Sequence, residues 1–497
     1  MKLATGLAVS ALLSSTAAFA QTLEVAVDAS PSGLDPHIVT AFSSFQLIDG
    51  TVYEGLTGLS DTLEIVPALA KDWSISKDGL TYTFTLREGV TFHDGSAMTA
   101  EDVAASLRRV QSEAIGSPLA SRLAAVEGIA AESDTTVVLT LSAPSAPLLS
   151  SLSTIAIVPA EFEEDAETLQ RETNGTGPFV FAEWQPNVAV RFKANADYWQ
   201  EGLPRVDGVD FNIVPEAATR LVGLQSGQYH MLPHIDATTA LQAQGQPGVE
   251  LVETLELAYS LVGMNVTREP LGEPAVREAI NYAIGRDDLV QAALFGAGVP
   301  GGPLSPALEN FAVPTSEFSC FAADPEKARS LLEEAGVETP VELELLVLPR
   351  DDTRAIAQVI QQQLGAVGIE VSLDIPEIGA FVQAWRNSDF DMFVSLNSGT
   401  IEPDDYFYRT FRSDGSTNVF GYVNAELDAL LDQGRSETDP GARAEIYADV
   451  QRMLACDGPA AFLTYGQLYT AMREGVDGYT IYPNRSLAAL RSVSLGE

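Results

Sequence analysis

Residues 79–110, which read GLTYTFTLREGVTFHDGSAMTAEDVAASLRRV, carry the clearest local structure in the chain. From Leu80 to Leu86 apolar side chains alternate with polar ones, and this period of two predicts a strand with one buried face. Asp94-Gly95 supplies the residues of a tight turn. Thr99, followed three residues later by Asp102, predicts a helix with a capped N-terminus. The stretch therefore predicts a strand, a turn and a helix, in that order.

Strands and helices alternate along the rest of the chain, so the expected fold class is α/β. Residues 341–375 predict a strand, a helix and a second strand, and this order favours parallel pairing of the two strands. Residues 103–169 are expected to be mostly helical, with one strand at 135–141. Two further apolar runs, at 258–266 and 460–466, each predict a strand.

The first twenty residues have the features of a secretory signal peptide. Lys2 supplies the basic region, residues 7–13 the apolar core, and Ala18-Phe19-Ala20 the cleavage site between small residues. Cleavage would leave Gln21 at the N-terminus, with no cysteine there to carry a lipid. No later segment approaches the run of about 20 apolar residues that a membrane helix needs. We therefore expect a protein that is exported to the periplasm.

The chain is strongly acidic, with 28 Lys and Arg against 69 Asp and Glu and a formal net charge of −41. Such a surface repels nucleic acids and anionic lipids, so we expect neither as a partner. Hydrophobic residues make up 46% of the 497 residues, which is ample for packed cores in about three domain-sized units.

Cys320 and Cys456 are the two cysteines, and in an oxidising compartment they predict a disulfide. The bond would close a loop of 136 residues, which is worth roughly 4–5 kcal/mol by loop-closure entropy. The alternative is two separate buried thiols. Neither cysteine has metal-ligand spacing, and the sequence has no zinc, phosphate-binding or nucleophile-elbow motif. We therefore expect no metal, no cofactor and no enzymatic activity.

Residues 78–103 (DGLTYTFTLREGVTFHDGSAMTAEDV) are similar to the signature region of the bacterial extracellular solute-binding proteins that serve peptide, nickel and opine ABC importers. VYEGL (52–56), PALAKDW (67–73) and NGTGPFVF (174–181) resemble the same family, and the resemblance covers nearly the whole mature chain. It implies a two-lobed periplasmic-binding-protein-like fold (type II), with an extra subdomain inserted in the first lobe.

The resemblance also implies how the chain is divided. The backbone is expected to cross from the first lobe to the second near 258–266 and to return near 460–466. The expected units are a signal peptide (1–20), a first-lobe core (21–54, 179–265 and 480–497), an inserted subdomain (55–178) and a second lobe (266–479).

Members of this family bind a solute in the cleft between the lobes and deliver it to an inner-membrane permease with ATPase subunits. The resemblance therefore implies a periplasmic substrate-binding component of an ABC importer, and we expect a monomer. Its ligand would be an oligopeptide, an opine or a similar small solute. One alternative is a secreted hydrolase acting on peptides or glycans, which the acidic pair Asp404 and Asp405 supports. Another is a chaperone-like periplasmic factor.

A ligand cleft needs a few placed polar groups on an apolar and aromatic wall. The candidate ligand-binding residues, at strand ends and in the loops that follow, are His37, Tyr259, Asn265, Arg350, Trp385, Asn397, Ser398, Asp404 and Asp405.

The dipeptide site of the family is not reproduced residue by residue. Gly399 stands where dipeptide-binding members carry the Asp that holds the ligand's ammonium group. Val347 lies near the position of their carboxylate-binding Arg, and Ile378 at that of a covering Trp. The solute is therefore open between a larger peptide, an opine and another polar molecule.

Overall fold

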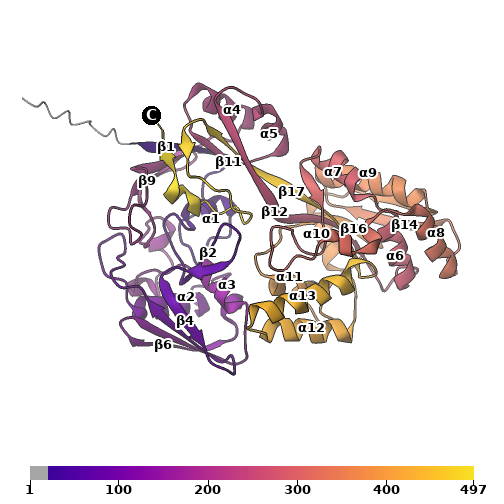
Figure 1. Ribbon diagram of the computed structural model, residues 1–497, viewed down its shortest axis with the longest axis horizontal. Coiled ribbons are helices and arrows are strands. Elements are labelled where there is room, and N and C mark those ends of the chain that lie inside the picture. The colour runs from indigo at the N-terminus through magenta and orange to yellow at the C-terminus, as the bar shows by residue number, and fades with distance from the viewer. Residues whose placement is uncertain (1–20, 497) are drawn as a thin grey trace, which may run out of the picture.

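The computed structural model describes residues 21–496, so the signal peptide expected at 1–20 lies outside the described residues. Two lobes are joined by a pair of long neighbouring strands, and a smaller subdomain extends the first lobe (Figure 1). The expected two-lobed α/β fold is confirmed. Within residues 21–496, no helix is both long enough and apolar enough to cross a membrane.

One mixed sheet of eleven strands runs through both lobes. Its order is β15-β14-β16-β12-β17-β11-β1-β10-β9-β8, and β13 pairs with β17 beside this path. The first-lobe strands are β1 (Thr22–Val27), β8 (Phe179–Gln185), β9 (Ala189–Ala194), β10 (Gly208–Ile213) and β11 (Met231–Ile235). The second-lobe strands are β13 (Gly298–Pro300), β14 (Val341–Val347), β15 (Ile369–Asp374) and β16 (Met392–Asn397). The strands shared by the lobes are β12 (Val249–Met264) and β17 (Ala460–Arg473).

β12 and β17 hold the two lobes together. They pair in antiparallel fashion, from Val249 opposite Arg473 to Gly263 opposite Ala460. At one end β17 also pairs with β11, and at the other end β12 pairs with β16. Each lobe is therefore built onto the same two strands. The strand predicted at 258–266 is only the buried second half of β12, because the first half is partly exposed and carries glutamates.

Helices cover the sheet in both lobes. In the first lobe they are α1 (Phe42–Ile48), α4 (Ala217–Ser226) and α5 (Ala237–Ala243). In the second lobe they are α6 (Pro274–Ala283), α7 (Arg286–Leu294), α8 (Pro325–Glu334), α9 (Asp351–Gly365), α10 (Ile378–Arg386), α11 (Pro403–Phe411), α12 (Ala425–Ser436) and α13 (Pro440–Ala455). β14 pairs in parallel with both β15 and β16, which confirms the pairing expected from the strand–helix–strand pattern.

The inserted subdomain is built on a four-stranded antiparallel sheet in the order β4-β5-β7-β6. Its elements are β2 (Thr57–Leu59), β3 (Ile65–Pro67), β4 (Ala70–Ile75), β5 (Thr81–Leu86), α2 (Ala100–Gln111), β6 (Val126–Ser133), β7 (Thr136–Leu141) and α3 (Leu148–Thr154). The predicted strand is β5, and its Tyr82 and Phe84 are buried. The predicted helix is α2, whose capping box joins the Thr99 backbone N–H to the Asp102 carboxylate at 2.8 Å. Both predictions are confirmed.

The expectation that residues 103–169 are mostly helical is wrong. β6 lies in this range and pairs with β7, while the acidic run at 161–167 forms no α-helix. The sequence VEGIAAES of β6 is poor in β-branched residues and mostly exposed. β6 is an edge strand, so one side of its backbone is unpaired and few of its side chains need burial. The apolar alternation that reveals buried strands is therefore absent from it.

The division of the chain also differs from the expected one. The second lobe was expected to extend to residue 479, whereas Val476 and Tyr479 are buried in the first-lobe core. Leu169, expected in the inserted subdomain, packs in that same core. The return crossing lies inside β17, because this one strand pairs with β11 of the first lobe and with β13 of the second. A strand without an interruption leaves no boundary signal in the sequence.

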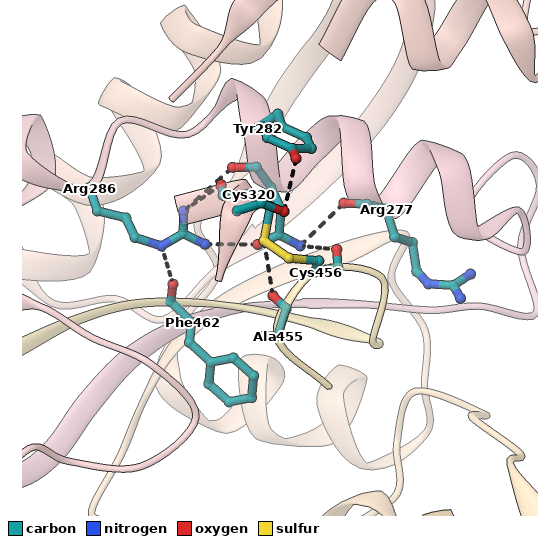
Figure 2. The surroundings of a disulfide bond; sticks show 9 residues. Arg277, Tyr282, Arg286, Cys320, Ala455, Cys456 and Phe462 are labelled. Atoms are coloured by element: carbon teal, nitrogen blue, oxygen red, sulfur yellow. Dashed lines mark hydrogen bonds between the residues drawn. A yellow bond between two sulfur atoms is a disulfide. The ribbon is translucent and has the colours of Figure 1, made fainter. Parts of the chain in front are cut away.

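Cys320 and Cys456 are joined in a disulfide, with their Cα atoms 5.7 Å apart (Figure 2). The bond ties the loop before α8 to the C-cap of α13. Next to it the buried Arg286 donates through Nε to the carbonyl oxygen of Phe462, at 2.7 Å. The Arg286 guanidinium also lies over the Phe321 ring, 3.7 Å from its centroid. The disulfide and this arginine together fix the loop before α8 against β17.

Replacing both cysteines by serine (C320S together with C456S) should lower the free energy of unfolding by up to about 5 kcal/mol, since the bond closes a long loop in the unfolded chain. Urea unfolding followed by tryptophan fluorescence measures the change. Reductant should shift the midpoint of the wild-type protein in the same direction and leave the double variant unchanged. Equal midpoints for wild type and variant would show that the bond does not contribute to stability.

Candidate ligand-binding site

A cavity of about 240 Å³ lies between the lobes, where all the major parts of the chain meet. The inserted subdomain contributes Arg122 and part of α3, and β12 contributes residues 256–258. The second lobe adds residues 398–401 and Asp405. Residues 483–485, which belong to the C-terminal return into the first lobe, complete the wall. The cavity is therefore an interlobe site.

Arg485 and Glu256 form an ion pair at the wall of this cavity. The Arg485 Nη2 atom lies 2.8 Å from the Glu256 Oε1 atom. The Arg485 backbone has a φ of 62°, a left-handed conformation that is uncommon outside glycine and carries a cost of about 1–3 kcal/mol. The surrounding structure holds this conformation, and the ion pair joins the C-terminal return of the chain to the crossing strand β12.

Asp405 brings a negative charge to the cavity from the first turn of α11. Its neighbours Glu402 and Asp404 each have an arginine partner, Arg443 and Arg435 respectively. Burial between the cleft walls raises the pKa of Asp405 to about 6, and the negative charge of Glu402 acts in the same direction. By surface area Asp405 is nevertheless an exposed residue. It is thus accessible and incompletely solvated, as expected of a group that binds a cation.

Arg122 brings a positive charge to the same cavity from the other lobe. It follows α2 in a short 3₁₀ turn, Ala120–Leu123, and its guanidinium donates a hydrogen bond to the Thr154 hydroxyl. Its charge lowers the pKa of Asp405, opposing the effect of burial. The cavity therefore presents one acidic and one basic group from opposite lobes, next to an internally neutral Arg485–Glu256 pair.

Some of the predicted site residues do line two cavities, of which only the first lies between the lobes. Asp405 and Ser398 line the 240 Å³ cavity. Ser398 also lines an adjacent cavity of about 250 Å³, together with Asn397 and Trp385. Tyr259 is almost fully buried, packs its ring 5.4 Å from that of Tyr406, and lines neither of these two cavities.

Other predicted site residues are in positions that do not suit ligand binding. His37 is fully buried, donates through Nε2 to the Ala156 carbonyl at 2.8 Å and accepts from Arg109 at 3.0 Å. Burial lowers its pKa to about 4, so it stays neutral. Arg109 in turn pairs with the buried Asp35 at 2.7 Å. His37 is therefore part of the first-lobe core, and its expected cleft role is not supported.

Asn265, Asp404 and Arg350 are also engaged by the protein itself. The Asn265 amide donates to the Ser388 and Phe390 carbonyls and accepts from Thr267. Asp404 is buried and pairs with Arg435 at 2.7 Å. Arg350 pairs with Asp352 at 2.9 Å at the start of α9 and lines neither of the two cavities. Asn265 and Asp404 therefore complete buried hydrogen bonds, a common role for polar residues inside a protein, whereas the Arg350–Asp352 pair lies at the surface.

Gly399 explains why the dipeptide arrangement is missing. Its φ is +69°, and a Cβ atom there would lie 2.1 Å from the Leu257 carbonyl oxygen. A side chain at this position would therefore collide with the backbone of β12. The loop after β16 approaches the crossing strand too closely for an aspartate at 399, and the cleft carboxylate comes from α11 instead.

Sequence reasoning missed Arg122, Glu256 and Arg485. No local motif marks them, and Glu256 and Arg485 are separated by 229 residues in the chain. One weak signal is the Pro483-Asn484 pair before Arg485, which indicates an irregular backbone at that point. Only the three-dimensional fold brings these residues to one cavity.

A cleft between two lobes that share crossing strands, with opposite charges on its two sides, defines a solute-binding protein of the hinged type. Residues 64–418 match the profile of the bacterial extracellular solute-binding proteins, family 5 (middle region), and the chain belongs to this family. The resemblance found in the sequence is confirmed.

The chain is similar over nearly its whole length to proteins of this family. It is 27% identical to the dipeptide-binding protein of Escherichia coli strain K12, over 96% of this chain and 95% of that protein. It is 31% identical to the glutathione-binding protein GsiB of Shigella dysenteriae, with the same coverage. The oligopeptide-binding protein AppA of Bacillus subtilis, solved with a nonapeptide, superimposes with a TM-score of 0.73 at 28% identity, over 96% of this chain and 100% of that one.

These relatives are binding proteins, and the hydrolase alternative is not supported. Its one argument was the acidic pair Asp404 and Asp405. Asp404 is held by Arg435, so the pair does not present two free carboxylates to a substrate. Within residues 21–496, no group of three or more His, Cys, Asp or Glu side chains is placed to hold a metal ion.

Asp405 should make the stability of the protein depend on pH. Its pKa in the folded protein, about 6, lies above the ordinary value of 3.8, so the folded state binds a proton that the unfolded state has lost. Between these values the Asp405 contribution to stability falls as the pH rises. D405N should therefore gain stability relative to wild type between about pH 4 and pH 7.

Urea unfolding midpoints of both proteins across this range measure the effect. D374N, which changes an exposed aspartate of β15, is the matched control and should track the wild type. A difference between D405N and wild type that stays constant with pH would contradict the raised pKa.

Proposed function

We propose that this protein is the periplasmic substrate-binding component of an ABC importer, exported by a signal peptide at 1–20, and that its solute is a zwitterionic peptide or peptide-like molecule. The observation that carries the proposal is the placement of Arg122 and Asp405, from opposite lobes, at one interlobe cavity. The names of its relatives, which bind a dipeptide, glutathione and a nonapeptide, support the same class of solute.

Each charged group has a partner in such a solute. The Asp405 carboxylate binds the ammonium group, and the Arg122 guanidinium binds the carboxylate through paired N–H donors. The Glu256–Arg485 ion pair is internally neutral, so it offers polar contacts to the peptide backbone without selecting one sign of charge. A solute with both charges satisfies both lobes, whereas a simple cation or anion leaves one side of the cavity unpaired.

This arrangement links binding to closure of the cleft. Arg122 belongs to the first lobe and its subdomain, and Asp405 to the second lobe, so the solute contacts both sides only when the lobes are close together. A ligand that binds the closed conformation more tightly than the open one shifts the population toward the closed conformation. In this proposal the membrane permease recognises the closed conformation of the binding protein. The ATPase subunits of the importer supply the energy for transport. The binding protein itself acts as a monomer and performs no reaction.

Isothermal titration with trialanine tests the two charged groups. R122Q and D405N should each weaken binding about 10- to 150-fold, the range for loss of one hydrogen bond to a charged group. R171Q, which changes an exposed arginine outside the cavity, is the control and should bind as wild type does. Trialanine blocked by an N-acetyl and a C-terminal amide group should bind weakly to all four proteins.

Two outcomes would contradict the proposal. One is equal affinity of R122Q, D405N and wild type for trialanine, which would place the peptide elsewhere. The other is recovery of cleaved peptide from the titration cell by mass spectrometry, which would indicate hydrolysis rather than binding.

The affinity for trialanine should also decrease as the pH falls from 7.5 to 5. Asp405, with its pKa of about 6 in the free protein, takes up a proton in this range and loses its attraction for the ammonium group. In D405N the same change of pH should have little effect. A wild-type affinity that does not change with pH would show that Asp405 does not hold the ammonium group.

A further inference from the structure

A third and larger cavity also lies beside the charged one. Its volume is about 740 Å³, within the range typical of whole ligand sites, and it lies between the inserted subdomain and the second lobe. Ser150 and Ile401 line both cavities, so the larger chamber is the immediate neighbour of the charged site. Next to it, the Ala146 backbone N–H donates to the Arg435 carbonyl at 2.9 Å, which joins the two walls.

The lining of this chamber is mainly apolar. Strands β3, β4 and β5 and helix α3 supply one wall, and residues 310–311, 401–402 and the start of α13 supply the other. The apolar and aromatic side chains that line it are Leu63, Ile65, Trp73, Ile75, Tyr82, Leu149, Phe311 and Ile401.

Of the three charged residues that line the chamber, Glu402 and Arg443 neutralise each other, and Glu64 is exposed to solvent. Glu402 and Arg443 form an ion pair in which the two side chains are only 5% and 8% exposed. Glu64 accepts a hydrogen bond from the Asn310 amide at 3.0 Å. The chamber therefore favours an uncharged, apolar group over a charged one, which would displace a paired residue. The chamber differs in this respect from the charged cavity, which Arg122 and Asp405 line with opposite charges.

We propose that this chamber binds a bulky apolar side chain of the same solute whose charged ends are held by Arg122 and Asp405. The inference rests on the proposed function and specifies it: the preferred solutes are peptides with a large aromatic or aliphatic side chain. A phenylalanine side chain buries enough apolar surface to raise affinity about 10- to 100-fold over alanine when it leaves water for such a site.

The experiment compares trialanine with the three tripeptides in which one alanine is replaced by phenylalanine, by isothermal titration. At least one phenylalanine peptide should bind wild type 10-fold or more tightly than trialanine does. A444W fills the chamber from α13, where Ala444 is half-buried in its wall. A442W adds the same side chain two residues away on an exposed position of the same helix, outside the chamber.

A444W should bind trialanine as wild type does but lose the gain from phenylalanine, and A442W should keep both. Trp73→Ala, which removes an aromatic wall of the chamber, should reduce the same gain without a new bulky group. Equal affinity for trialanine and all three phenylalanine peptides overturns the chamber proposal and leaves the charged site standing. If A444W still binds a phenylalanine peptide more tightly than trialanine, the phenylalanine side chain lies outside the chamber. Absence of binding to all four peptides overturns the proposed function and this inference together.

Discussion

The antiparallel pairing of β12 with β17 is the constraint on which the two-lobed structure depends. β17 pairs with β11 of the first lobe and β13 of the second, and β12 pairs with β17 and with β16 of the second lobe, so the sheet is continuous between the lobes only through these two strands. The lobes are thereby joined through paired strands, and a hinge motion between them has to bend these strands. Residues 256–258 of β12 also line the charged cavity. The element that connects the lobes thus forms part of the wall at which the solute binds.

The charged groups of the candidate binding site come from both lobes and meet in the cleft between them. Arginine and carboxylate groups inside the lobes pair with one another, as Arg109 does with Asp35 and Arg443 with Glu402. Removing one partner of such a buried pair costs about 3–5 kcal/mol because it leaves an uncompensated charge. Arg122 and Asp405 instead line one cavity from opposite lobes, on a molecule with a formal charge of −41. A zwitterionic solute adds no net charge, so it enters this acidic protein without an overall electrostatic penalty.

The sequence predicted those parts of the fold that depend on neighbouring residues. β5 alternates because one face is buried, and the capping box of α2 joins residues only three apart. β6 was not predicted, because an exposed edge strand needs no alternating apolar pattern. The site was harder, since a polar residue at a strand end has two roles that look alike in sequence. Asp405 and Ser398 face a cavity, whereas His37 and Asn265 complete buried hydrogen bonds, and only long-range packing distinguishes them.

Small-angle X-ray scattering tests most directly whether a zwitterionic solute closes the cleft by bridging Arg122 and Asp405. The measurement compares the radius of gyration of wild type and D405N, each with and without trialanine at a concentration that calorimetry shows to saturate wild type. A bridging solute should make wild type more compact and leave D405N unchanged. An unchanged radius in saturated wild type, or the same compaction in D405N, would contradict the bridging role of this pair.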